Sequence, residues 1–128
     1  MRFLLDTHIL LWVLGDPAKL SRMARHNILD PSNDVWFSAA SIWEIAIKSQ
    51  LRKTEFKANP EEVARAATES GLDELPIRAH HAALTARLPA HHRDPFDRLL
   101  VAQAMAEPAR LLTADAALRR YSELVVVL

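Results

Sequence analysis

The hydrophobic residues of the chain fall into short runs separated by polar turns. Five runs are too short for helices and predict strands, at 3–5, 35–37, 75–77, 110–113 and 124–128. Helical spacing and helix-start signals predict helices at 8–14, 21–29, 38–48, 60–70, 78–88, 95–106 and 116–120. In the third of these helices, the expected core-facing stripe is Ile42, Ile45, Ala46 and Ser49. Continuously apolar strands that alternate with helices predict a three-layer α/β/α fold with a mainly parallel sheet.

Composition narrows the class of protein. The 128 residues are 50% hydrophobic and 25% charged, which predicts a single domain over 1–128 with one core of ordinary size. The 16 basic and 16 acidic residues cancel, so nucleic acid would have to bind through a local patch. The absence of cysteine excludes disulfides, thiolate catalysis and cysteine zinc sites. The two glycines form no Gly-rich loop, which excludes the P-loop and the dinucleotide fingerprint.

The apolar N-terminal segment at 3–14 raises the question of a signal peptide or a membrane anchor. Asp6 and His8 interrupt it, no basic region of any length precedes it, and it is too short to span a bilayer. We therefore expect a cytoplasmic protein without a membrane attachment.

Four acidic residues stand beside predicted strands or near helix starts. Asp6 directly follows the first strand, and Asp115 lies just beyond the strand at 110–113. Glu44 and Asp97 lie near the N-terminal ends of predicted helices. In a parallel sheet whose helices run back, strand ends and helix N-termini meet at the carboxyl edge, where ligands bind. We therefore expect all four carboxylates at one edge of the sheet.

Each acid also has an ordinary structural explanation. Asp6 could cap the helix that follows it, and Glu44 could form a surface ion pair with Lys48, worth only a few tenths of a kcal/mol. At 94–97, Asp94 fits an N-cap followed by proline, which leaves Asp97 in the first turn near the positive end of the helix dipole. The other interpretation keeps Asp94 as the cap and makes Asp97 a catalytic carboxylate.

Four clustered carboxylates have a chemical consequence. They repel one another, so without a counter-charge some would have to hold a proton. A hard divalent cation relieves the repulsion, and a ligand set made only of oxygen favours Mg²⁺ or Mn²⁺. Such an ion can lower the pKa of a bound water and neutralise charge on the leaving oxygen of a phosphodiester. The pattern therefore predicts metal-dependent hydrolysis.

Four segments of the chain together resemble the PIN-domain ribonucleases, specifically the VapC-like toxins of bacterial toxin–antitoxin pairs. They occur in the family's order and cover nearly the whole chain. The segments are Leu4-Leu5-Asp6-Thr7-His8, the stretch from Ser41 to Lys48, the stretch from Arg93 to Ala104, and Leu112-Thr113-Ala114-Asp115.

The resemblance implies a role for each residue of the site. The metal-binding and catalytic acids would be Asp6, Glu44, Asp97 and Asp115, with Mg²⁺ or Mn²⁺ as the cofactor. Thr7 and Thr113 would orient carboxylates or waters. Asp97 is chosen as the metal-binding acid because it occupies the acid position immediately before the Leu/Val/Ala helix. Asp94 is expected to be the helix cap, and a supporting role for it beside the metal remains open.

The resemblance also implies a substrate and partners. Such a toxin would cleave cellular RNA (tRNA, rRNA or mRNA) to inhibit translation, would form a homodimer and would be neutralised by a cognate VapB-like antitoxin. Basic residues that could guide the RNA are Lys48, Arg52, Lys53, Arg93 and Arg98. The run from Lys48 to Lys57 is equally explained as a solvated surface. His91 and His92 form a pair in a polar loop and are left out of the metal site.

Two other functions remain open. A phosphatase of the haloacid-dehalogenase type would place a second acid two residues after Asp6, where this chain has His8. A non-catalytic PIN-like module would bind nucleic acid or protein without cleaving, although all four acids are present. Metal-dependent ribonuclease activity separates this module from the enzyme.

Overall fold

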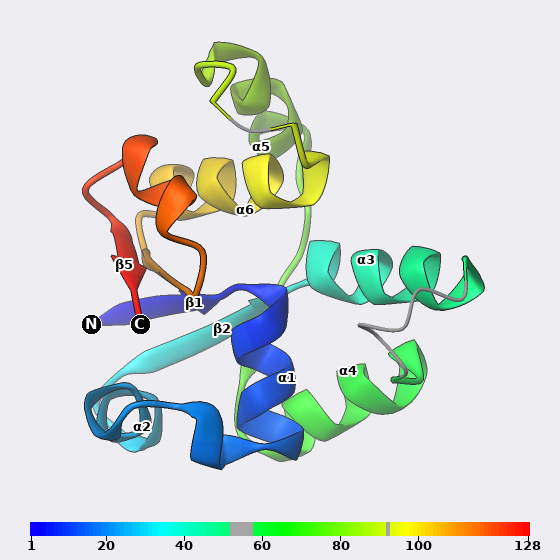
Figure 1. Cartoon of the computed structure of the whole chain (residues 1–128), viewed down its shortest axis with the longest axis vertical. Helices are drawn as coiled ribbons and strands as arrows, with labels where there is room; N and C mark the ends of the chain where they lie inside the picture. The colour runs from blue at the N-terminus through cyan, green and yellow to red at the C-terminus, as the bar shows by residue number, and fades with distance from the viewer. Residues whose placement is uncertain (52–57, 92) are drawn as a thin grey trace.

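Strands and helices alternate along the chain, as Figure 1 shows. The structure is a computed structural model that describes residues 1–51, 58–91 and 93–128. The strands are β1 (Arg2–Leu5), β2 (Asp34–Ser38), β3 (Asp73–Leu75), β4 (Arg110–Thr113) and β5 (Val125–Val127). The helices are α1 (Thr7–Gly15), α2 (Arg22–Leu29), α3 (Ala39–Gln50), α4 (Pro60–Glu69), α5 (Ala79–Leu84) and α6 (Pro95–Ala106), with 3₁₀ turns η1 (Pro17–Lys19), η2 (Thr85–Arg87) and η3 (Ala116–Arg120).

The described strands form one sheet in the order β3-β2-β1-β4-β5, and every neighbouring pair is parallel. Helices α5 and α6 lie on one side of the sheet, and α1 and α2 lie on the other (Figure 1). The predicted α/β/α architecture with a parallel sheet is confirmed.

The two faces of the sheet carry separate hydrophobic clusters. Phe3 and Leu5 belong to the cluster that packs against α1, α2 and α4, whereas Leu4 belongs to the cluster formed with α6 and η3. All three side chains are buried. Successive side chains of a strand point to opposite faces, so a sheet covered on both faces requires a strand that is apolar throughout.

Strand β3 differs in position from the sequence prediction. It pairs with β2 through Asp73–Leu75, so it ends where the predicted strand at 75–77 begins. Pro76 has no N–H with which to continue the ladder, which explains the early end. The strand lies at the edge of the sheet, as its proline indicates.

Helix α3 buries a different face from the one that hydrophobic spacing predicts. Its buried residues are Ala40, Ser41, Glu44 and Ile45. Of the expected stripe only Ile45 is buried, while Ile42, Ala46 and Ser49 are half-buried. Two polar side chains thus lie on the inner face of the helix, because they have hydrogen-bond partners there.

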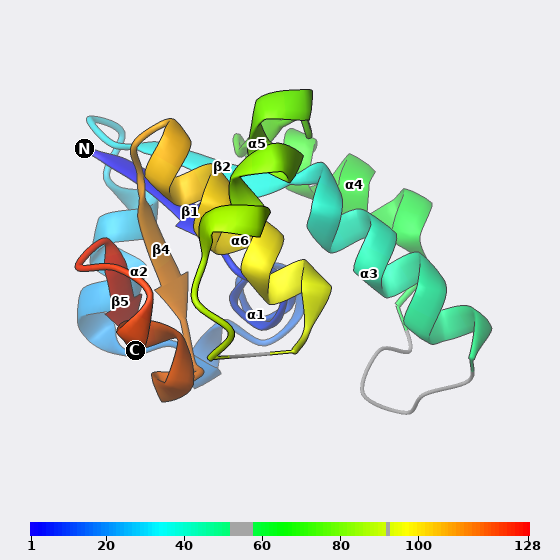
Figure 2. The ribbon, with the colours of Figure 1, turned by 90° about the horizontal axis from the view of Figure 1, so that it is seen from above.

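The parallel sheet brings the ends of its strands to one edge. Asp6 follows β1, Asp115 follows the neighbouring β4, and α3 follows β2 on the other side of β1. Helices α3 and α6 lie side by side in both ribbon views (Figure 1, Figure 2). In the part of the chain that the structure describes, no helix is long and apolar enough to cross a membrane.

Candidate active site

Asp6 lies at the end of β1 and caps α1. Its Oδ1 accepts a hydrogen bond from the backbone N–H of Ile9 at 2.9 Å, and its Oδ2 accepts one from the hydroxyl of Thr113 at the end of β4. The Thr113 hydroxyl oxygen also accepts from the backbone N–H of Asp115 at 3.0 Å. One threonine hydroxyl therefore connects the two acids that follow neighbouring strands.

Asp115 is half-buried at the start of η3. Its Oδ1 accepts from the backbone N–H of Ala117 at 2.9 Å, so it caps this turn much as Asp6 caps α1. The explanation of Asp6 as a cap is thus correct, and Asp115 caps as well. Capping is compatible with a second role, because a capping carboxylate retains lone pairs for another partner.

Glu44 is buried between two elements. It is 3% exposed, its Oε1 accepts from the Thr7 hydroxyl at 2.6 Å, and its Oε2 lies 2.6 Å from Lys48 Nζ. The hydroxyl of Ser41 lies 3.0 Å from that of Thr7. The expected i,i+4 pair with Lys48 therefore forms, but on a buried carboxylate instead of a solvated surface.

Asp94 and Asp97 are separated in role by their contacts. Asp94 Oδ1 accepts from the backbone N–H groups of Phe96 at 2.8 Å and Asp97 at 3.3 Å, which confirms Asp94 as the N-cap of α6. Asp97 is half-buried in the first turn of the same helix. Its carboxylate lies near the positive end of the helix dipole, where negative charge is stabilised.

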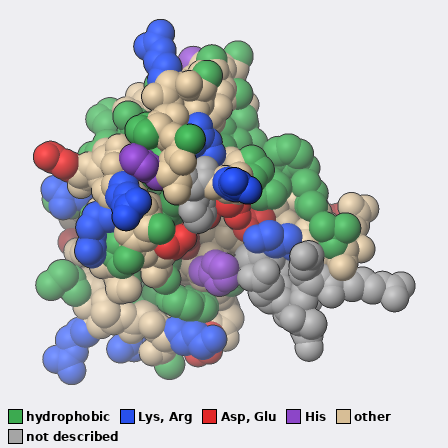
Figure 3. Space-filling model, turned by 45° about the horizontal axis from the view of Figure 1, so that its top comes forward, with side chains coloured by type: hydrophobic (Ala, Val, Ile, Leu, Met, Phe, Trp, Pro, Cys, Tyr) green, Lys and Arg blue, Asp and Glu red, His purple; other side chains and the backbone are tan. Residues whose placement is uncertain are grey.

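Asp6 occupies an unfavourable electrostatic environment. Burial raises the pKa of Asp6 above its usual value, and the charge of Glu44 acts in the same direction. The hydrogen bonds from Thr113 and Ile9 oppose this shift, because they favour the ionised carboxylate. Figure 3 shows acidic side chains gathered near the middle of one face, bordered by Lys or Arg side chains and a histidine.

Comparison with protein families identifies the domain. The profile of the PIN domain matches residues 3–124, nearly the whole chain. The chain belongs to the PIN-domain family. PIN domains are typically metal-dependent nucleases, and they generally use a divalent ion. No curated protein sequence matches this chain.

Two solved structures share the fold of this PIN domain. The structure of VapBC2 from Rickettsia felis, bound to a DNA fragment from its promoter, matches with a TM-score of 0.70 at 18% identity, covering 100% of this chain and 98% of that chain. The structure of FitAcB from Neisseria gonorrhoeae matches with a TM-score of 0.60 at 19% identity, covering 98% and 96%. At this level of identity the likeness shows the fold.

The donor set of the PIN domain fits a hard divalent cation. Asp6, Glu44, Asp97 and Asp115 offer only oxygen ligands. Among the described residues, three ligating side chains come within 4.8 Å of one another only at His80, His81 and Glu107. The four acids are therefore spread more widely than a closed cage. This spacing suits Mg²⁺, which keeps several waters and takes one or two carboxylates directly.

The cluster of His80, His81 and Glu107 has its own structural explanation. His81 is fully buried, and its Nδ1 accepts from the backbone N–H of Arg78 at 3.0 Å. The ring proton of the neutral imidazole is then on Nε2, which donates to Glu107 Oε2 at 2.6 Å. Both ring nitrogens are used, and the contact ties α5 to the C-terminal end of α6.

The predicted RNA-contacting residues have different outcomes. The guanidinium of Arg98 donates to the carbonyls of Pro89 at 2.8 Å and Thr85 at 2.8 Å, with longer contacts to Leu88 and Tyr121. Arg98 therefore holds the segment before α6 in place, and its contact with RNA stays a prediction. Arg93 is exposed and Lys48 pairs with Glu44, whereas Arg52 and Lys53 lie outside the described residues, as does His92.

The sequence interpretation missed two features beside the acids. Ser41 is fully buried against Thr7, and its position one turn before Glu44 on α3 is the signal that could have revealed it. Trp43, next to Glu44, meets Phe96, next to Asp97, through an edge-to-face ring contact. Neither pairing follows from local sequence, because each joins segments far apart in the chain.

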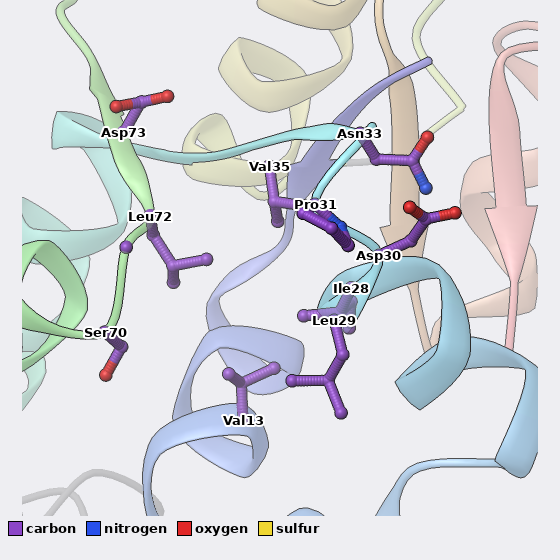
Figure 4. Close-up of a pocket in the computed structure, with 11 residues that line it drawn as sticks. Val13, Ile28, Leu29, Asp30, Pro31, Asn33, Val35, Ser70, Leu72 and Asp73 are labelled. Carbon is purple, nitrogen blue, oxygen red and sulfur yellow. The ribbon is translucent and has the colours of Figure 1, made fainter.

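A pocket of about 510 Å³ lies away from the acids, at the amino ends of β2 and β3 (Figure 4). Val13, Ile28, Leu29, Val35 and Leu72 supply most of its apolar lining. None of the predicted site residues that the structure describes lines it. This pocket is therefore separate from the four predicted acids.

Proposed function

We propose that this PIN domain is a VapC-like toxin, an endoribonuclease that depends on Mg²⁺ or Mn²⁺ and hydrolyses phosphodiester bonds in cellular RNA to inhibit translation. The supporting observation is the pair of buried carboxylates, Asp6 and Glu44, each bonded to a threonine hydroxyl. Burying charge costs free energy, and the two buried acids lie close enough for the charge of Glu44 to oppose ionisation of Asp6. A cation at this edge would balance them.

In this proposal, Asp6, Glu44, Asp97 and Asp115 hold the ion. When bound, it would lower the pKa of a water and offset negative charge on the phosphate. Thr113 fixes the orientation of the Asp6 carboxylate, and Thr7 fixes that of Glu44. Lys48 pairs with Glu44, and in this proposal it also contacts a phosphate oxygen.

The two structural relatives support the choice of a toxin. The names VapBC2 and FitAcB each denote a complex of two proteins, so we propose that this chain also binds a partner, a VapB-like antitoxin. We further propose that it acts as a homodimer and that its RNA substrate is a tRNA, rRNA or mRNA. The acidic edge is the expected site of antitoxin inhibition, because covering it excludes both cation and RNA.

A cleavage assay tests the function. Purified protein is incubated with total cellular RNA with and without Mg²⁺ or Mn²⁺, beside the variants Asp6→Asn and Glu107→Gln. We expect the ion-dependent cleavage to be lost in Asp6→Asn and retained in Glu107→Gln, whose carboxylate belongs to the separate histidine contact. RNA binding without cleavage by the wild-type protein would favour the non-catalytic module instead. Cleavage that Asp6→Asn retains would place the active site elsewhere.

A further inference from the structure

Two helices present the same order of side chains at the acidic edge, an aromatic residue followed by an acid. On α3 Trp43 precedes Glu44, and on α6 Phe96 precedes Asp97. The two rings meet edge to face, with centroids 5.1 Å apart and planes inclined at 79°. Trp43 is 55% exposed, whereas Glu44 is buried. The aromatic pair therefore forms an outer rim beside the buried carboxylate.

We propose that Trp43 and Phe96 form a stacking platform for an unpaired base of the RNA whose phosphodiester lies at the acids. This inference rests on the proposed ribonuclease function and adds the two side chains that would hold one base of that RNA. A base inside a duplex has both faces covered by its neighbours, so it cannot stack on a protein ring without first leaving the helix.

The charge of the site favours a base as the occupant. The chain has 16 basic and 16 acidic residues, and the acids at this edge repel phosphate groups until a cation is present. The guanidinium of Arg98 is used by backbone carbonyls. Stacking of a base on an aromatic ring supplies affinity that does not depend on net charge, and it tolerates any base, since every base has a π-face.

The ring geometry also fits this role. Edge-to-face contact with Phe96 restrains the Trp43 side chain while leaving more than half of it exposed. A restrained aromatic ring loses little conformational entropy on binding, which makes it a better platform than a freely rotating one. Because α3 and α6 pack together, the platform keeps a fixed position relative to Glu44 and Asp97.

Binding measurements in a variant that cannot cleave test the platform. All proteins carry Asp6→Asn, and a short unstructured oligoribonucleotide of mixed sequence is titrated by fluorescence anisotropy. Trp43→Leu keeps apolar bulk but removes the ring, Trp43→Phe keeps a ring, and Phe96→Leu provides an independent second variant. Met23→Ala is the matched control, because Met23 is also exposed and apolar but lies on α2. Thermal melting of each variant establishes that it is folded.

We expect Trp43→Leu to weaken binding by about five- to 150-fold, the range for loss of one stacked base, and Trp43→Phe to weaken it less. Phe96→Leu should also weaken binding, and Met23→Ala should not. Oligonucleotides with one base removed at a time add a second measurement. The parent protein should be most sensitive at one position, and Trp43→Leu should lose that sensitivity.

The outcomes separate the platform from the proposed function. Unchanged affinity and unchanged base sensitivity in Trp43→Leu would overturn the platform and leave the rim as a docking surface for a protein partner. If the protein with Asp6 intact still cleaved RNA in an ion-dependent way, the proposed function would survive that result. A protein that neither binds nor cleaves RNA would overturn both.

Discussion

Two clusters of ionisable side chains lie in different parts of this PIN domain, and they balance their charges differently. In the histidine cluster of His80, His81 and Glu107, each nitrogen of the buried His81 ring has a partner, one a backbone N–H and the other a carboxylate. In the acid cluster, the proposed site of Asp6, Glu44, Asp97 and Asp115, Lys48 pairs with the buried Glu44 and the Thr113 hydroxyl bonds to Asp6.

In the proposed assignment, the metal site is not the place where the ligand atoms lie closest together. The histidine cluster is the more compact of the two, yet its hydrogen bonds are complete and its buried imidazole holds its proton toward Glu107. The acid cluster is more open, but burial and the charge of Glu44 both raise the pKa of Asp6. We propose that this unfavourable burial of a carboxylate, more than the proximity of ligand atoms, indicates where a cation binds.

The largest expected effect separates the role of Asp97 in the acid cluster from that of the neighbouring Asp94. Asp97→Asn should lower RNA cleavage by at least about a hundredfold, since even outer partners of metal ligands are worth 10–100-fold. Asp94→Asn should keep most activity, because asparagine caps a helix about as well as aspartate and the hydrogen bonds to Phe96 and Asp97 can be retained. Initial rates in Mn²⁺ measure both. If Asp94→Asn were inactive and Asp97→Asn active, the two roles would have to be exchanged.

The next effect distinguishes the two clusters by their response to metal. A divalent ion that binds only the folded protein stabilises it by about 2.7 kcal/mol at a hundred times its Kd. We therefore expect Mg²⁺ or Mn²⁺ to raise the melting temperature of the wild type. Asp6→Asn/Asp115→Asn should lose that response, because it removes two ligands while keeping two helix caps.

Substitution in the histidine cluster provides the control for the metal response. Glu107→Gln should shift with Mg²⁺ or Mn²⁺ as the wild type does, since Glu107 bonds to His81 and lies outside the acid cluster. An unchanged response in the double variant, or a lost response in Glu107→Gln, would move the ion to another site.

Removal of the Glu107 carboxylate tests how much the histidine cluster contributes to stability. Glu107→Ala leaves the buried Nε2–H of His81 without its acceptor, which should destabilise the protein by about 1–3 kcal/mol. Urea unfolding of metal-free protein measures the change. RNA cleavage at a temperature where the variant is folded should stay near the wild-type rate. A large loss of activity in the folded variant would show that the two clusters are coupled.

The smallest expected effect is a pH dependence that only the acid cluster should produce. Burial raises the pKa of Asp6 in the folded protein, so the folded state binds this proton more tightly than the unfolded chain does. The stability due to protonated Asp6 is complete below the unfolded pKa and is lost as pH rises through the folded pKa. Without metal, Asp6→Asn should therefore be more stable than the wild type at neutral pH. The advantage should shrink as pH falls towards 4, and urea unfolding across that range would reveal a constant difference if the prediction were wrong.

Much of the fold follows from the hydrophobic pattern, because an all-parallel sheet leaves a clear signal. The apolar runs at Phe3–Leu5 and Leu111–Leu112 are buried on both faces, and Asp94 caps its helix as predicted. Ser21 and Asn59 also start their helices with side-chain caps. The meeting of Asp6 and Asp115 at one edge also follows, since it requires only that β1 and β4 run in parallel.

Other features could not be predicted, and the reasons are physical. Hydrophobic spacing assigns apolar residues to the inner face of a helix, so it misplaces α3, where Ser41 and Glu44 are buried by hydrogen bonding. The Arg98 contacts depend on which carbonyls the preceding segment leaves open. From sequence alone, a basic residue in the first turn of a helix, such as Arg98, is predicted to be a surface charge, because the carbonyls that it contacts are not known.

Thr113 has a consequence for how the spacing of the site is set. Its hydroxyl joins Asp6 to the backbone of Asp115, and the N–H of Asp6 itself donates to the carbonyl of Leu112 at 3.0 Å. The backbones that carry the two acids are therefore held at the separation of neighbouring strands, about 4.8 Å. The hydrogen-bonded pairing of β1 with β4 therefore sets the distance between the two acids. Loops and outer helix faces can diverge in sequence or length without changing that distance, whereas a slip of one residue between β1 and β4 would change it.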